Sequence, residues 1–288
     1  MARARLALHG ACAVVLLIAA TAGAALAAST LDTVRERGRI VFAYRDGALP
    51  FSFKSRDGHV RGYTVELCER IADAIRRELK RPDLKVEWVP VDAGSRLDAV
   101  TSGRVDAECG TTTITLGRME RVDFSVPIFV DGGALVVKSQ SPVQRLADLK
   151  GRRVAVIKGT TTERALQSAL QVGDVQSTLV PIARPEDGAK ALREGRADAW
   201  AGDRLVLTQV LLRDPEGEFT VLADDFSFEP YGIVVRRNDA DFRLLVNRAL
   251  VSAFKRGEID SIFQRWLAPL GKPSALINAM FYLNALPD

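Results

Sequence analysis

Residues 103–113 read GRVDAECGTTT, and this stretch decides the fold that the sequence predicts. Its middle, Val105–Cys109, has the pattern of a short buried strand, and a glycine and three threonines follow at the strand's end. Later in the chain residues 195–199 read GRADA, which repeats the same passage from a helix end into a strand. A unit that returns in this way indicates two lobes of like construction.

Strand and helix patterns alternate on both sides of this stretch. Val65, Cys68, Ile71 and Ile75 fall at helical spacing, and Thr64 stands where it could cap that helix. The expected strands are Ile40–Tyr44, Val86–Val91, Val154–Ile157 and Ala197–Trp200; the expected helices are Thr64–Lys80, Arg96–Ser102, Thr162–Leu170, Glu186–Arg193, Asp239–Lys255 and Glu258–Trp266; and an apolar tail, Ala279–Leu286, should pack on the body. This alternation predicts an α/β fold with a largely parallel sheet.

Residues 1–28 have the pattern of an export signal peptide. Arg3 and Arg5 precede an apolar run at 11–20, and residues 25–27 supply the small side chains that a signal peptidase reads. A retained membrane anchor is the alternative, but a spanning helix needs about 20 strongly apolar residues and this run is shorter. We therefore expect cleavage after residue 27 or 28, a soluble mature chain and a periplasmic location.

Composition excludes several classes of function. Lys and Arg number 40 against 36 Asp and Glu, a formal excess of +4 that does not indicate a nucleic-acid partner. Only His59 among the two histidines lies after the leader, and the chain has no phosphate loop, no GxSxG and no HExxH motif. We therefore expect no metal site, no cofactor and no catalytic centre, so the sequence favours a binding protein over an enzyme.

Two cysteines, Cys68 and Cys109, lie outside the leader. An exported protein meets an oxidising compartment, in which these residues could form a disulfide. Cys68 falls on the apolar side of an expected helix and Cys109 at the end of an expected strand. We interpret them as two separately buried thiols, with the disulfide as the alternative.

Three segments at strand ends have the chemistry of an amino-acid head-group site. Gly110–Thr113 is followed by Arg118, Gly159–Thr162 opens a helix, and Gly202 is followed by Asp203. Free N–H groups at a helix start, hydroxyls and a guanidinium suit a carboxylate, and an aspartate suits an ammonium group. Strand carboxyl ends are where open α/β sheets bind ligands, so we expect an α-amino acid to bind there.

At these residues the sequence resembles the extracytoplasmic solute-binding proteins of polar amino acid ABC transporters (family 3), and within them the glutamate/aspartate-binding branch. The similar motifs are Ser29–Asp32, Pro50–Ser52, Gly62-Tyr63, Asp106–Gly110, Asp123–Ser125, Asp148–Gly151, Gly159–Thr161, Tyr231-Gly232 and Trp266. The resemblance implies a two-lobed periplasmic-binding-protein fold of type II, with ligand in the cleft between lobes and two crossing hinge strands near Val130–Gly133 and Pro230–Val234. It implies a first lobe of residues 29–131 plus 231–288 and a second lobe of residues 132–230.

The resemblance also implies roles for individual residues. Arg118 would bind the α-carboxylate, helped by Thr111, Thr113 and the helix start at Thr161, and Asp203 would pair with the α-ammonium group. Arg45 and Arg96 stand where the acidic-ligand branch carries arginines that select a second carboxylate.

The chain departs from the branch at the side-chain pocket. No histidine stands near Pro185, where the branch has one in its second lobe; Arg184 or Lys158 could substitute for it. Ala93 also replaces a serine of the branch.

The function implied is periplasmic binding of glutamate or aspartate and delivery, by hinge closure of a monomer, to an inner-membrane ABC permease. The alternatives are binding of glutamine or another dicarboxylate, or a periplasmic dehydratase on the same fold. A dehydratase would need an acid in the cleft, for which Glu66 and Glu108 are the candidates.

Overall fold

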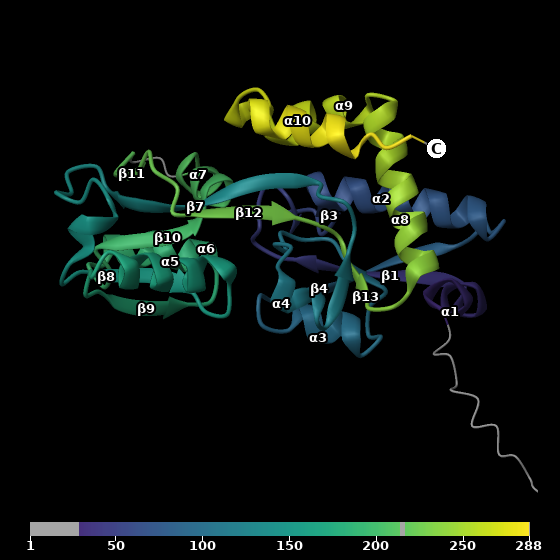
Figure 1. Cartoon of the computed structure of the whole chain (residues 1–288), viewed down its shortest axis with the longest axis horizontal. Coiled ribbons are helices and arrows are strands. Elements are labelled where there is room, and N and C mark those ends of the chain that lie inside the picture. The colour runs from purple at the N-terminus through teal and green to yellow at the C-terminus, as the bar shows by residue number, and fades with distance from the viewer. Residues whose placement is uncertain (1–28, 214–216, 288) are drawn as a thin grey trace, which may run out of the picture.

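The computed structural model describes residues 29–213 and 217–287, and in it the chain forms two α/β lobes side by side (Figure 1). Each lobe is built on its own sheet, which confirms the two-lobed α/β fold predicted from the sequence. The expected signal peptide, residues 1–28, lies outside the described residues.

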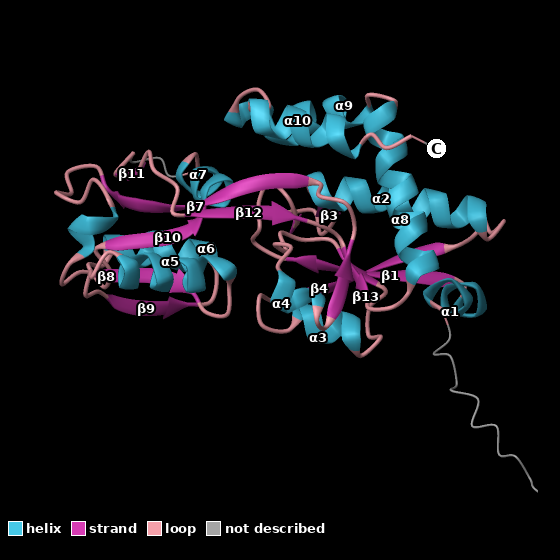
Figure 2. Ribbon diagram, viewed as in Figure 1, coloured by secondary structure: helices cyan, strands magenta, loops and turns pink. Residues whose placement is uncertain are grey.

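The first lobe contains a five-stranded sheet of order β4-β1-β5-β13-β6, mixed in direction. Helices α2, α8, α9 and α10 lie on one side of it, and α3 and α4 lie on the other (Figure 2). The strands are β1 (Arg39–Arg45), β4 (Lys85–Val91), β5 (Ala107–Glu108), β6 (Val122–Phe124) and β13 (Val234–Arg236), with a small hairpin of β2 (Phe53–Lys54) and β3 (Val60–Arg61). The helices are α1 (Thr30–Arg37), α2 (Tyr63–Glu78), α3 (Arg96–Thr101), α4 (Leu116–Met119), α8 (Ala240–Lys255), α9 (Glu258–Leu267) and α10 (Ala275–Asn284), with a 3₁₀ turn at Ala268–Leu270.

The second lobe contains the sheet β11-β7-β10-β8-β9, with β12 paired to β7. Helices α6 and α7 cover one face of this sheet and α5 covers the other. The strands are β7 (Phe129–Lys138), β8 (Arg153–Ile157), β9 (Thr178–Ile182), β10 (Ala199–Asp203), β11 (Phe219–Val221) and β12 (Ser227–Tyr231); the helices are α5 (Thr161–Val172), α6 (Pro185–Arg193) and α7 (Arg204–Leu211), with a 3₁₀ turn at Leu146–Leu149.

Two long strands run between the lobes. In β7 and β12 the partners are antiparallel, from Phe129 opposite Tyr231 to Gly133 opposite Ser227. Figure 1 shows both strands passing from one lobe to the other. The crossing segments expected near Val130–Gly133 and Pro230–Val234 therefore overlap this paired ribbon.

The repeated GRVDA and GRADA segments form the same local structure in each lobe. Asp106 donates its N–H to the Val41 carbonyl, and its carboxylate accepts the Val41 N–H at 2.7 Å. Asp198 does the same with Arg153, whose N–H reaches the carboxylate at 2.8 Å. The aspartate in each copy therefore fixes the second strand of its lobe against the first.

Helix α2 begins earlier than the sequence predicted, and Thr64 is not its cap. The N-cap is Gly62, with φ of 135°, and a side-chain carbon there would lie 2.2 Å from the Phe51 carbonyl oxygen. Only glycine allows both this backbone conformation and this close approach. Thr64 lies inside the helix, and its hydroxyl is buried without a hydrogen-bond partner.

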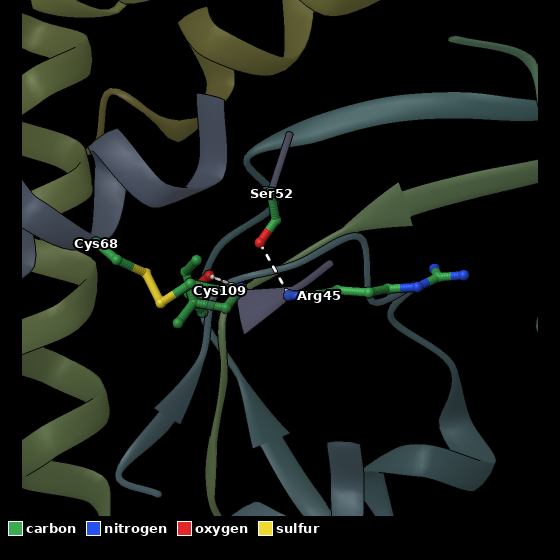
Figure 3. The surroundings of a disulfide bond; sticks show 6 residues. Arg45, Ser52, Cys68 and Cys109 are labelled. Carbon is green, nitrogen blue, oxygen red and sulfur yellow. Dashed lines mark hydrogen bonds between the residues drawn. A yellow bond between two sulfur atoms is a disulfide. The ribbon is translucent and has the colours of Figure 1, made fainter. Parts of the chain in front are cut away.

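Cys68 and Cys109 form a disulfide, so the preferred interpretation of two separate thiols was wrong (Figure 3). The apolar face of α2 lies directly on the first sheet at the end of β5, and this packing places the two Cα atoms 6.3 Å apart. Both patterns in the sequence were interpreted correctly as buried, but their faces meet at the same point of the same core.

The C-terminal tail packs on the body as expected, in the form of helix α10. Ile277, Met280 and Phe281 are buried in the core of the first lobe. Asn284 donates its side-chain N–H to the Pro127 carbonyl at 2.7 Å, just before β7 begins.

Candidate functional site

Three arginines of the first lobe are buried around one loop. Arg45 ends β1, Arg96 begins α3 and Arg118 lies in α4, and each is at most 8% exposed. A guanidinium is rarely so buried without a partner of opposite charge, so this cluster needs an explanation beyond packing.

The loop that gathers them is Thr111–Thr113, which follows β5. Arg45 Nη1 donates to Thr111 Oγ1 at 2.9 Å, Arg96 Nη1 to the Thr111 carbonyl at 3.3 Å, and Arg118 Nη1 to the Thr113 carbonyl at 2.7 Å. The structure therefore brings together these five residues, which the sequence assigned to one site.

The backbone of Arg45 is itself fixed. Its N–H donates to Ser52 Oγ at 3.0 Å, and Figure 3 shows its side chain extending away from the disulfide. Because β1 is central in the sheet and its end is held in this way, the guanidinium is presented from a rigid base.

Burial and mutual repulsion weaken the proton affinity of these guanidiniums. Burial, and then the charges of Arg45 and Arg118, lower the pKa of Arg96 to about 9. Burial also lowers the pKa of Arg118, and the charge of Arg164 adds to it. Arg96 stays cationic at neutral pH, and its Nε has no hydrogen-bond partner in the described chain. An anion beside these groups would relieve both penalties.

The second lobe supplies a helix start and a carboxylate. Thr160 caps α5 by accepting the Glu163 N–H on its hydroxyl at 3.1 Å, and Thr161 is the first residue of that helix. Asp203 ends β10, is half-buried, and accepts the Thr162 hydroxyl at 2.7 Å. The free N–H groups at the start of α5 can bind an anion, and Asp203 can bind a cation.

Glu229 joins the two lobes at this place, and the sequence reasoning missed it. It lies on β12, is 1% exposed, and its Oε2 accepts hydroxyl hydrogen bonds from Thr113 at 2.6 Å and from Thr161 at 2.7 Å. No motif surrounds it; the one signal was a charged residue between aromatic residues in a strand, which is unusual unless the carboxylate has partners inside.

A small cavity of about 30 Å³ lies between the lobes. Arg45 and Ala48 line it from the first lobe, and Thr160, Thr162 and Asp203 line it from the second. The side chains gathered from both lobes therefore border one enclosed space.

Several other candidates lie elsewhere. Glu66 is bound by Arg265 and by the Trp266 indole N–H at 2.7 Å on α9. Lys158 and Arg184, proposed as substitutes for the missing histidine, are exposed, as is His59. Glu108 is fully buried beside Gly110, and neither of its carboxylate oxygens has a hydrogen-bond partner among the described residues.

In residues 29–213 and 217–287 no three His, Cys, Asp or Glu side chains are placed to hold a metal ion. Over the same part of the chain, no helix is long and apolar enough to cross a membrane.

Comparison with known proteins agrees with this architecture. The family model of the bacterial extracellular solute-binding proteins, family 3, matches residues 40–269, so the chain belongs to that family. An L-glutamate/L-aspartate-binding protein of Pseudomonas aeruginosa is 32% identical over 249 residues, which are 86% of this chain and 82% of that protein. A glutamate/aspartate import solute-binding protein of Salmonella typhimurium is 31% identical over 246 residues, 85% and 81% of the two chains.

The fold is that of the amino-acid-binding proteins of this family. A solved structure of an ancestral arginine-binding protein bound to glutamine superposes with a TM-score of 0.72 and 30% identity, and covers 80% of this chain and 98% of that one. Similar proteins thus differ in the ligand that their names carry, so kinship establishes an amino-acid-binding scaffold and leaves the ligand to the site.

Proposed function

We propose that the protein binds an acidic L-amino acid, glutamate or aspartate, between its lobes and delivers it unchanged to the permease of an ABC transporter. The observation that carries this proposal is the cluster of buried Arg45, Arg96 and Arg118 around one loop, facing a helix start and a carboxylate of the other lobe. A dicarboxylate with one ammonium group matches that arrangement of charges.

The α-carboxylate would bind Arg118 and the N–H groups at the start of α5. Arg118 is held by the Thr113 carbonyl at 2.7 Å, so its remaining N–H groups keep a fixed direction. The positive end of the α5 dipole adds to the attraction. Asp203, tied to α5 through Thr162, would take the α-ammonium group.

The second carboxylate would bind Arg45 and Arg96. Both reach Thr111, one through its hydroxyl and one through its carbonyl, and this common anchor sets their spacing. A cationic ligand side chain would meet two buried positive charges, and a neutral amide would leave them without a counter-charge.

The entrance to the cleft has the same bias. A wider hollow of about 780 Å³ is lined from both lobes, and its basic side chains outnumber its acidic ones. The basic residues are Lys54, Arg56, Arg184 and Arg213, and the acidic residues are Asp46 and Glu186. Such a field speeds the arrival of anions, more at low salt than at high salt.

Binding would close the lobes on the paired strands β7 and β12. The cavity of about 30 Å³ is too small for an amino acid, so entry requires the lobes to separate, and ligand contacts to both lobes favour the closed form. We place the lobes at residues 29–131 with 231–288 and at residues 132–230, in an exported, periplasmic monomer.

Calorimetric titration with glutamate, aspartate, glutamine, arginine and cystine tests the proposal. We expect glutamate or aspartate to bind at least about 100-fold more tightly than glutamine, since the amide leaves a buried charge pair unmatched. Nuclear magnetic resonance of the recovered ligand should show no chemical change. Preferred binding of a neutral or basic amino acid, or turnover of the ligand, would refute the proposal.

A further inference from the structure

Glu229 presents a buried carboxylate to both lobes at once. Oε2 accepts the hydroxyls of Thr113 and Thr161, and Oε1 accepts the Ser227 hydroxyl at 2.7 Å. Phe228, the preceding residue on β12, is 64% exposed, so the strand turns the carboxylate inward and the aromatic ring outward.

The hydrogen atoms of this group settle what the threonines can offer. The oxygen atoms of Thr113 and Thr161 lie 3.0 Å apart, and both lie within 2.7 Å of Glu229 Oε2. Each hydroxyl has one hydrogen, and a carboxylate accepts but does not donate. When both hydrogens point to Glu229, the two hydroxyl oxygens face each other with lone pairs only.

Two neighbouring lone-pair donors suit a cationic ligand group. A ligand carboxylate would find no hydrogen on either hydroxyl, whereas an ammonium group can donate to both and still reach Asp203 with its third hydrogen. Asp203 belongs to the same corner of the second lobe, because Thr162, next to Thr161 on α5, donates to it at 2.7 Å.

We propose that Glu229 is a positioning residue for the ligand's α-ammonium group: it holds the hydroxyl hydrogens of Thr113 and Thr161, so that both oxygens accept from the ammonium. This inference rests on the proposed amino-acid binding and changes one expected role, since the two threonine hydroxyls then serve the ammonium and the α-carboxylate is left to Arg118 and backbone N–H groups. It also makes recognition of the amino group depend on both lobes, because Thr113 precedes α4 of the first lobe and Thr161 begins α5 of the second.

The test compares glutamate with glutarate, which has both carboxylates and lacks the amino group. Binding of each is measured by calorimetry for the wild-type protein and for Glu229→Gln. The amide can turn its N–H toward the threonines and release their hydrogens, and it removes the negative charge. Glu87→Gln, an exposed carboxylate on β4, is the matched control.

We expect Glu229→Gln to weaken glutamate by about 10-fold or more while glutarate changes by less than about threefold, because one charge-assisted set of contacts is lost only with the amine. The control should change neither. Equal loss of both ligands would mean a merely structural role and would overturn the proposal, as would unchanged glutamate binding.

A second variant covers the case in which Glu229→Gln does not fold. Thr161→Val removes one accepting oxygen and leaves Glu229 in place, and it should again weaken glutamate and spare glutarate. Equal effects on both, or none, would contradict the proposal. Should the wild-type protein prefer another amino acid, the proposed acidic specificity fails, and the same comparison with that amino acid and its des-amino analogue still decides the role of Glu229.

Discussion

Replacement of Cys68 and Cys109 by alanine, singly and together, measures what the disulfide contributes to the stability of the first lobe. The bond closes a loop of 41 residues that contains α2, β4 and α3. In the chain-entropy description, closing such a loop removes about 13 cal/mol/K from the unfolded ensemble, or about 4 kcal/mol at 25 °C. Both cysteines are fully buried, so lost packing adds about 1 kcal/mol for each sulfur removed.

The assay is urea denaturation followed by circular dichroism, with the wild-type protein, both single variants and the double variant. Either single replacement already breaks the bond, so each should lower the free energy of unfolding by about 5 kcal/mol. The double variant should lose only about 1 kcal/mol more, because no second bond remains to be broken.

Additive losses would refute this reasoning. Two independent buried thiols would each cost about 1–2 kcal/mol, and the double variant would show their sum. Alkylation of the unfolded wild-type protein without reductant provides the chemical control, since neither residue should react.

Three further predictions follow from single positions. Burial and then a neighbouring carboxylate raise the pKa of Asp131 to about 8 from its ordinary 3.8, so the folded state alone holds this proton between these values, and stability should fall by several kcal/mol as pH rises from about 4 to about 8; urea denaturation of Asp131→Asn should lose that slope, and an unchanged slope would contradict it. Arg96→Met should reduce the preference for glutamate over glutamine by about 10-fold to 100-fold in calorimetry, with exposed Arg104→Met as control, and an unchanged ratio would remove Arg96 from the side-chain pocket. Gly62→Ala should cost about 3 kcal/mol or more in unfolding experiments, because its Cβ would lie 2.2 Å from a carbonyl oxygen, whereas Gly58→Ala, with open space around it, should cost about 1 kcal/mol; equal costs would contradict the steric explanation.

The local patterns carried the fold well, because burial in each element follows one period. The helix expected at Thr64–Lys80 is α2, Tyr63–Glu78, and the strand expected at Val86–Val91 is β4, Lys85–Val91. The strand expected at Val105–Cys109 is shorter, since regular pairing covers only Ala107–Glu108. Asp106 there turns its carboxylate to the neighbouring backbone, a use that hydrophobic patterning does not reveal.

What escaped the sequence are meetings between distant elements. The disulfide depends on where α2 lies along the sheet, which spacing alone does not give. Glu229 contacts Thr113 and Thr161, which stand 116 and 68 positions before it. Nothing near Glu229 in the chain signals those partners, because the crossing of β7 and β12 creates the contact. The arginines were found because each follows or precedes a strand end, and strand ends converge in this fold.

The paired strands between the lobes act mechanically as a ribbon. The antiparallel register from Phe129–Tyr231 to Gly133–Ser227 resists sliding, because a slip of one residue would turn every inward side chain outward, Glu229 among them. A two-stranded ribbon yields more readily to bending and torsion than to shear. The lobes therefore swing like a door on one axis, and each closing stroke returns Thr113 and Thr161 to the same carboxylate.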